Sequence, residues 1–172
     1  MGEIMFKRFA AIALLLALAG TRALADPTLV GTLYDSQGTS ALILIVLTPT
    51  ADAPQKAAGI DIKYQHLDEH YKFDGKYDDL TVTFMNTDDW QKFVSLWTKA
   101  RSAQGETDAG DYFAAGTLLT VSRESDGEIA FTMAGNPNAN NVPQSIDIFR
   151  LQPKDFAAFD ETAKKVSAYF EK

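Results

Sequence analysis

Two amphipathic helical patterns, each placed directly after an alternating run, constrain the fold of this 172-residue chain more than any other feature. Apolar residues at helical spacing predict a helix over residues 87–103, preceded by an alternating strand over residues 79–85. A second stripe predicts a helix that begins at Pro153, directly after a strand over residues 145–151. This order of strands and helices predicts an α+β domain.

The other strands are predicted from runs of β-branched and aromatic residues that turn residues separate. Residues 41–48 form an unbroken apolar run, which indicates a strand buried on both faces. Polar, glycine-containing residues 104–111 predict a loop, and Asp126-Gly127 predicts a hairpin between strands 116–124 and 128–134. With a further strand over residues 28–34, we expect a mainly antiparallel sheet of about six to eight strands, with both helices packed on one face.

The second strand and helix repeat the pattern of the first pair at an offset of 66 residues, which suggests a doubled strands-then-helix unit. Three of the six aligned pairs are identical, so common binary patterning explains the match equally well. The aligned pairs are Leu80 with Ile146, Val82 with Ile148, Asp89 with Asp155, Trp90 with Phe156, Phe93 with Phe159, and Lys99 with Lys165.

A doubled order of four strands and one helix resembles the PUR and Whirly single-stranded nucleic-acid binders, in topology alone. The resemblance implies a fold, and a fold does not carry a function. Nucleic-acid grooves need a basic track with interleaved aromatic residues, whereas this chain has a net charge of −7. We therefore expect no nucleic-acid partner.

The N-terminus has the layout of a cleavable secretory signal, with a charged start, an 11-residue apolar run and a small-residue cleavage site that ends at Ala25. As a helix the run would span about 17 Å, against about 30 Å of membrane hydrocarbon. Translation from either Met1 or Met5 leaves this layout intact. We expect removal of residues 1–25, no membrane insertion afterwards, and a single globular domain over residues 26–172.

The chain contains no cysteine, which excludes disulfides and thiolate metal sites. Small secreted eukaryotic domains usually depend on disulfides, so this composition favours the bacterial periplasm, or secretion from a bacterium, as the location. Removing residues 1–25 takes three basic residues and one acidic residue from totals of 16 and 23, which leaves 13 and 22 and a net charge of −9. Polyanions are therefore not expected as partners.

Both histidines lie in His66-Leu67-Asp68-Glu69-His70, which matches the His-x-x-Glu-His motif of the inverted zinc peptidases. That chemistry needs two imidazoles on zinc and a glutamate that deprotonates the bound water. The two imidazoles would lie about 6 Å apart on a helix but about 13 Å apart along a strand. Flanking isoleucine and aromatic residues favour strands, and hence an exposed acidic turn without metal. A weak, non-catalytic divalent-metal site is the intermediate interpretation.

Residues 135–144 form a loop with four asparagines and two prolines. Its amide groups donate and accept hydrogen bonds without charge, which suits sugars or peptide backbones as well as solvent. The candidate ligand-binding residues are Asn136, Asn138, Asn140 and Asn141.

No complete catalytic set can be assembled from the sequence, because it has neither a Gly-x-Ser-x-Gly elbow nor a glycine-rich phosphate loop. We expect an exported, soluble, non-enzymatic binding or accessory protein of the bacterial cell envelope, with a protein or small polar ligand as partner and no cofactor. The alternative is a small zinc-dependent hydrolase that uses His66, Glu69 and His70. Helices on one side of a sheet leave its other face to a partner, to a second copy in a homodimer, or to polar residues such as Thr120 and Ser122.

Overall fold

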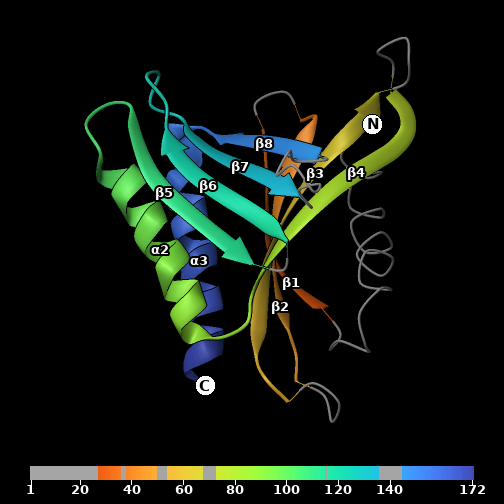
Figure 1. Cartoon of the computed structure of the whole chain (residues 1–172), viewed down its shortest axis with the longest axis vertical. Coiled ribbons are helices and arrows are strands. Elements are labelled where there is room, and N and C mark those ends of the chain that lie inside the picture. Colours follow the sequence, from red (N-terminus) through yellow and green to blue (C-terminus); the bar gives the residue numbers. More distant parts are fainter. Residues whose placement is uncertain (1–26, 36–37, 50–53, 68–72, 115, 136–144) are drawn as a thin grey trace.

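The chain folds into two antiparallel four-stranded sheets and two helices (Figure 1). The computed structural model describes residues 27–35, 38–49, 54–67, 73–114, 116–135 and 145–172, with the backbone alone for residues 65–67, 73–78 and 145–147. Sheet A contains, in spatial order, β1 (Pro27–Tyr34), β2 (Ser40–Leu47), β3 (Ala57–Leu67) and β4 (Phe73–Phe84). Sheet B contains β5 (Thr107–Ala114), β6 (Thr117–Arg123), β7 (Ile129–Gly135) and β8 (Ser145–Leu151). Helix α2 (Thr87–Ser102) follows sheet A, and α3 (Phe156–Glu171) follows sheet B after a short 3₁₀ turn (Pro153–Asp155).

The structure confirms the α+β class, but the expected single sheet is wrong. Neighbouring strands lie about 4.8 Å apart, so eight strands in one sheet would extend about 34 Å. Two helices, each about 10 Å across, would cover only about 20 Å of that width. In two smaller sheets, both inner faces pack in the same core as the helices. Within the described residues, the apolar side chains of these inner faces are therefore covered.

Strand β2 is buried along its whole length, as its unbroken apolar sequence predicts. It lies between β1 and β3, and Leu42, Leu44 and Val46 point into the main core. The alternate side chains point to the outer face of sheet A, where Ile43 and Ile45 belong to a second buried cluster. That outer cluster consists of Ala41, Ile43, Ile45, Leu47 and Ala57.

The predicted loop over residues 104–111 is wrong from Thr107 onward, because β5 begins there. The register of β5 against β6 shifts between Asp108 and Gly110, which marks a β-bulge. Gly110 has φ of 126°, a conformation that favours glycine. The bulge interrupts the two-residue alternation on which strand prediction depends, and this explains the error.

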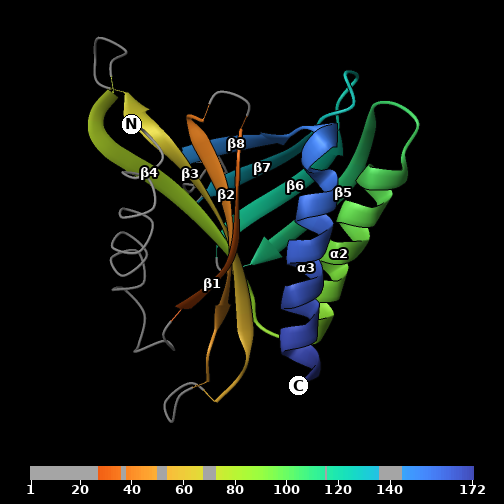
Figure 2. The same cartoon turned by 180° about the vertical axis from the view of Figure 1, so that it is seen from behind.

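Each helix packs on the sheet of the other half of the chain. Helix α2 lies on β5 and β6, whereas α3 lies on β1 and β2. The remaining strands close the core by sheet-to-sheet contact, with β4 against sheet B and β8 against sheet A. Figures 1 and 2 show the two helices side by side along one flank of the molecule. The two halves are therefore interlocked rather than merely adjacent.

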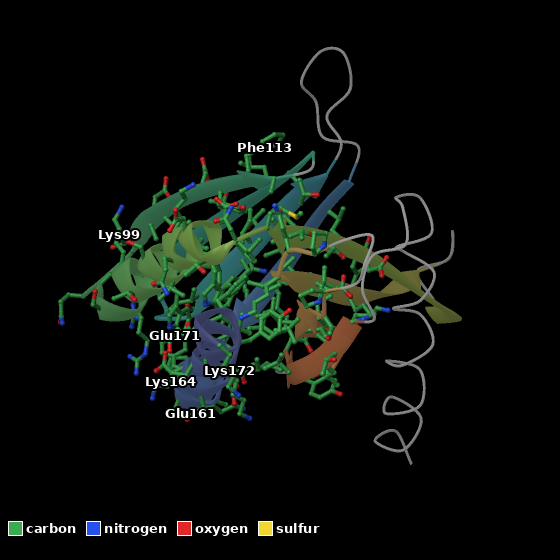
Figure 3. The ribbon with its side chains drawn as sticks, turned by 90° about the horizontal axis from the view of Figure 1, so that it is seen from below. Lys99, Phe113, Glu161, Lys164, Glu171 and Lys172 are labelled. Atoms are coloured by element: carbon green, nitrogen blue, oxygen red, sulfur yellow. The ribbon has the colours of Figure 1, made fainter. Side chains whose placement is uncertain are left out.

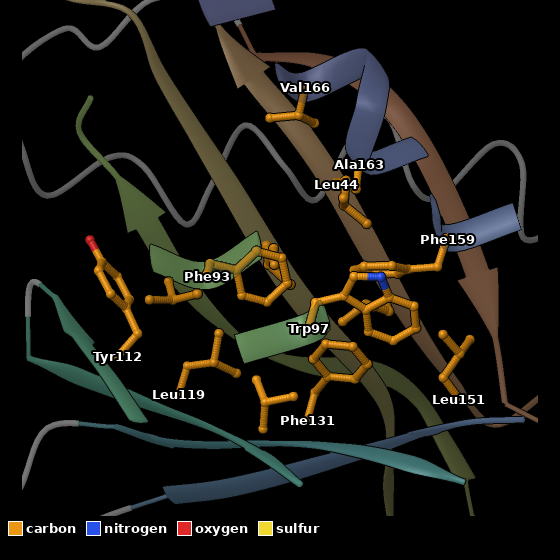
Figure 4. Close-up of a cluster of buried hydrophobic side chains, with 14 of the residues drawn as sticks. Leu44, Phe93, Trp97, Tyr112, Leu119, Phe131, Leu151, Phe159, Ala163 and Val166 are labelled. Carbon is orange, nitrogen blue, oxygen red and sulfur yellow. The ribbon is translucent and has the colours of Figure 1, made fainter. Parts of the chain in front are cut away.

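Both tryptophans of α2 donate their indole N–H groups to α3. Trp90 Nε1 lies 2.8 Å from Ser167 Oγ, and Trp97 Nε1 lies 2.7 Å from Asp160 Oδ1. The first turn of α2 thus lies beside the last turns of α3, and the second half of α2 lies beside the first turns of α3. The two helices therefore run antiparallel. Phe159 stacks close to Trp97, with ring centroids 4.3 Å apart, and Figure 4 shows this aromatic centre of the core. Buried indoles with satisfied donors fix the helix pair in one arrangement.

The structure contains the doubled unit that the sequence pattern suggested, with four strands and a helix in each half. Phe93 and Phe159 are equivalent under the offset of 66 and their rings contact each other, with centroids 6.2 Å apart. For the strands the offset of 66 is wrong by one residue, because it aligns buried Val82 with Ile148, which is 45% exposed. When the two sheets are compared strand by strand through their registers, Val82 of β4 corresponds to Phe149 of β8, which is also buried.

Both halves carry the same bulge in their first strand, and the glycine after it lies under the exchanged helix. The register of β1 shifts before Gly31, as that of β5 shifts before Gly110. A Cβ at Gly31 would lie 2.6 Å from the Thr162 side chain of α3, and one at Gly110 would lie 3.2 Å from Leu96 of α2. Thr162 and Leu96 are themselves 66 residues apart. Glycine in these strands therefore permits the close approach of each helix.

We predict that Gly31→Ala destabilises the protein by about 1–3 kcal/mol, because the added methyl group overlaps Thr162. In the double variant with Thr162→Ala, the added methyl meets only Cβ of residue 162 at 3.4 Å, an ordinary contact, and much of the loss should be recovered. Urea unfolding of the four proteins in a double-mutant cycle measures the coupling. Gly105→Ala is the control, since a Cβ there has no neighbour within 4 Å. Additive effects of the two changes would contradict the proposed contact.

Candidate binding surface

The histidine motif falls at the connection between β3 and β4. Residues Gln65–Leu67 continue β3 as extended backbone, and Leu67 is in register with Phe73 at the start of β4. His66 therefore belongs to a strand, in agreement with the strands expected here, and not to a helix. Glu69 and His70 lie outside the described residues, so the set of three candidate zinc ligands stays a prediction from the sequence.

The asparagine-rich loop connects β7 to β8. Its four candidate residues, Asn136, Asn138, Asn140 and Asn141, also lie outside the part of the chain that the structure describes. In the doubled fold this connection is equivalent to the one between β3 and β4. The two candidate sites predicted from the sequence thus occupy corresponding positions in the two halves.

The outer face of sheet B, on the side away from the helices, carries exposed apolar side chains at one end. Phe113 on β5 is 62% exposed at this end. Ile148, which is 45% exposed, lies on β8 at the opposite edge of the sheet, in the rung of Asp111, Thr120 and Thr132. Phe113 is in register with Leu118 of β6, which is in register with Ala134 of β7, and both of these are partly exposed. Figure 3 shows Phe113 projecting on the opposite side of the molecule from Glu161. We call this face, from Phe113 to Arg150, the outer face of sheet B.

The middle of this face is polar, as the sequence analysis anticipated for Thr120 and Ser122. Thr120 lies in register with Asp111 on one side and Thr132 on the other. Its hydroxyl donates a 2.6 Å hydrogen bond to Asp111 Oδ1. Because these side chains are short, the neighbouring apolar side chains stand above them and are available for contact.

The opposite end of the same face is acidic. Asp108 lies in register with Ser122, one rung beyond Asp111. The β6–β7 hairpin at this end adds Glu124, Asp126 and Glu128, whose carboxylate oxygens lie within 4.8 Å of one another. Polarity therefore changes along the strands, from apolar at Phe113 to carboxylates at Asp108 and the hairpin.

Arg150 partly neutralises the acidic end. Its Nε donates to Glu124 Oε2 at 2.9 Å, and in the described residues it is the one cation that forms an ion pair with these carboxylates. The hydrogen bond that Arg150 donates to Glu124, together with the charges of Glu124, Glu128 and Asp126, holds the pKa of Arg150 above its usual value. Arg150 therefore stays charged, and several carboxylates remain without a paired cation.

The backbone edge beside this face is partly closed. β5 is the outermost strand of sheet B, so its free edge is a potential pairing site for another chain. Lys99 Nζ lies 3.0 Å from the carbonyl oxygens of both Asp108 and Ala109, at the bulge. This ammonium group satisfies the carbonyls that the bulge leaves free, so side-chain contact on the face is favoured over strand addition there.

The apolar residues of this face were not predicted as site residues. Phe113 follows the segment that the sequence analysis assigned to a loop, so its orientation could not be inferred. The adjacent pair Tyr112-Phe113 was the available signal, since neighbouring residues of a strand point to opposite faces. Tyr112 is buried, with 8% of its surface exposed, and Phe113 must therefore point outward.

Comparisons with protein-family models, with curated proteins and with solved structures find no match to this chain. Among the described residues, no helix has the length and apolar character needed to cross a membrane. The function therefore has to be inferred from the chemistry of the chain's own residues.

We predict that the purified protein contains no stoichiometric zinc and that His70→Ala leaves the metal content unchanged. The physical reason is that the zinc motif holds both imidazoles on successive turns of one helix, whereas His66 lies in an extended strand. Elemental analysis of both proteins, after dialysis against buffer containing trace zinc, measures this. One equivalent of zinc that disappears in the variant would restore the hydrolase alternative.

Proposed function

We propose that this chain is a non-enzymatic binding or accessory protein of the bacterial cell envelope, exported through the signal at residues 1–25, and that a partner protein binds the outer face of sheet B. The observation that carries the proposal is the exposure of Phe113, at 62%, in a rung that continues through the partly exposed side chains of Leu118 and Ala134. Contiguous exposed apolar side chains with polar surroundings are typical of interaction surfaces. Aromatic residues contribute strongly to such interfaces, because they bury a large area at a small cost in side-chain entropy.

Several features support this surface over others. The buried residues of both helices and of the inner faces of both sheets already pack in one core, so they are occupied by internal contacts. Among the described residues, the other exposed large apolar side chains are those of Leu29, Tyr34 and Met85, which lie on or beside sheet A. Phe113 instead shares a sheet face with Asp111 and Asp108. A face with apolar and charged ends orients its partner, which favours a specific protein over a nonspecific apolar ligand.

The export part of the proposal predicts a mature protein that begins at Asp26. The small residues before it match the specificity of signal peptidases, and the apolar run is too short to remain as an anchor. Intact mass measurement of the protein from a periplasmic fraction checks this. A full-length chain recovered only from the cytoplasm would contradict export and leave the binding surface to be tested separately.

The binding part predicts a specific crosslink at Phe113. A photoreactive phenylalanine analogue at residue 113 should yield one discrete adduct in cells after irradiation, because the side chain lies within the partner's contact area. The same analogue at residue 85 is the control, since Met85 is 46% exposed but lies outside the surface, at the end of β4. Denaturing gels and mass spectrometry identify the adducts. Equal adduct patterns at both positions, or none at residue 113, would overturn the proposed surface.

A further inference from the structure

The outer face of sheet B has a spacing of apolar and acidic groups that specifies the chemistry of its partner. On β5, Phe113 and Asp111 point to the same face and are two residues apart, which corresponds to about 7 Å along a strand. Asp108 follows in the next rung, beyond the bulge. An extended peptide places every second side chain on one side with the same spacing of about 7 Å. A partner strand lying along β5 can therefore match these groups one to one.

The charges of the face select a basic partner. Asp111 receives a hydrogen bond from the Thr120 hydroxyl, but neither Asp111 nor Asp108 forms an ion pair within the described residues. The acidic hairpin at the same end contributes three more carboxylates against one guanidinium, that of Arg150. A second copy of this chain would offer the same excess of carboxylates and no complementary group of cations, which disfavours a homodimer through this face. Charge complementarity therefore favours lysine or arginine opposite Asp111 and Asp108.

We infer that the outer face of sheet B binds an extended polypeptide segment in which an apolar side chain is followed or preceded, two positions away, by a lysine or arginine. The apolar side chain packs between Phe113 and Leu118, and the basic group reaches Asp111, with a further basic residue opposite Asp108. This inference rests on the proposed function, since it names the partner chemistry for the same surface.

The test uses three fluorescently labelled peptides that carry phenylalanine and leucine in turn at every fourth position. The residue halfway between them, which lies on the same face of an extended peptide, is lysine in the first peptide, glutamate in the second and serine in the third. Fluorescence anisotropy with the purified protein should show the lysine peptide binding at least about tenfold more tightly than the glutamate peptide. Phe113→Ala should weaken binding of the lysine peptide. Asp111→Asn should weaken it by about two- to fivefold, the usual effect of one exposed charge pair, while its amide oxygen still accepts the Thr120 bond.

Matched variants separate these effects from general damage. Met85→Ala removes another exposed apolar side chain, 46% exposed, outside this face. Glu161→Gln removes a carboxylate on α3, on the other side of the molecule (Figure 3). Neither should alter binding of the lysine peptide. Unchanged unfolding midpoints for Phe113→Ala and Asp111→Asn confirm that they fold, as expected for exposed positions.

The outcomes distinguish this inference from the proposed function. Equal binding of all three peptides that depends on Phe113 would overturn the basic partner and leave the binding surface in place. If no peptide binds but a specific adduct still forms at residue 113 in cells, the inference of a short basic segment as partner is overturned, and the proposed binding surface stands. Failure of the peptides together with absence of that adduct would overturn both. An adduct between two copies of this chain would replace the basic partner with a homodimer.

Discussion

The structure depends on the exchange of helices between its two halves. Each helix packs mainly on the sheet of the other half, because α2 crosses to β5 and β6 while α3 returns to β1 and β2. The contact between Phe93 and Phe159, which occupy equivalent positions, lies where the two helices meet. Trp90 and Trp97 add hydrogen bonds on either side of it. All other packing, including the position of the outer faces, follows from this interlocked core.

The interlocked core explains why the outer face of sheet B is the place to look for function. Both helices and both inner faces are committed to the core, so interaction with another molecule has to use the outer faces, the edges or the connections. The edge of β5 is partly closed by Lys99, and sheet A places Ile43 and Ile45 in a buried cluster on its outer side. Sheet B instead exposes Phe113 and Ile148.

Local patterns were enough to predict most of the elements. The helical stripe of α2, the buried strand β2 and the Asp126-Gly127 hairpin all depend on residues close together in sequence, and all are found. The start of α2 is local as well, since the Asn86 side chain accepts a hydrogen bond from the Asp89 amide at 2.9 Å. Strand β5 was missed because its bulge breaks the alternation at Asp108 to Gly110.

The partition into two sheets and the exchange of helices could not be predicted in the same way. Whether β4 and β5 lie in one sheet depends on contacts such as that between α3 and β1, which join residues more than a hundred positions apart and leave no local signature. The candidate surface was missed for the same reason. Phe113, Asp111 and Ile148 share a face only through the registers of β5 to β8, and no spacing along the chain brings them together.

The C-terminal position of α3 has a consequence for the order in which the protein acquires its structure. The Tyr169 hydroxyl donates to the Leu47 carbonyl oxygen, and Gly31 lies beneath Thr162, so β1 and β2 pack on a helix that follows them by more than a hundred residues. The pairing of these two strands is local in sequence, whereas their packing on α3 closes a long loop. Sheet A can therefore pair its strands before α3 docks on it, and this part of the core closes late.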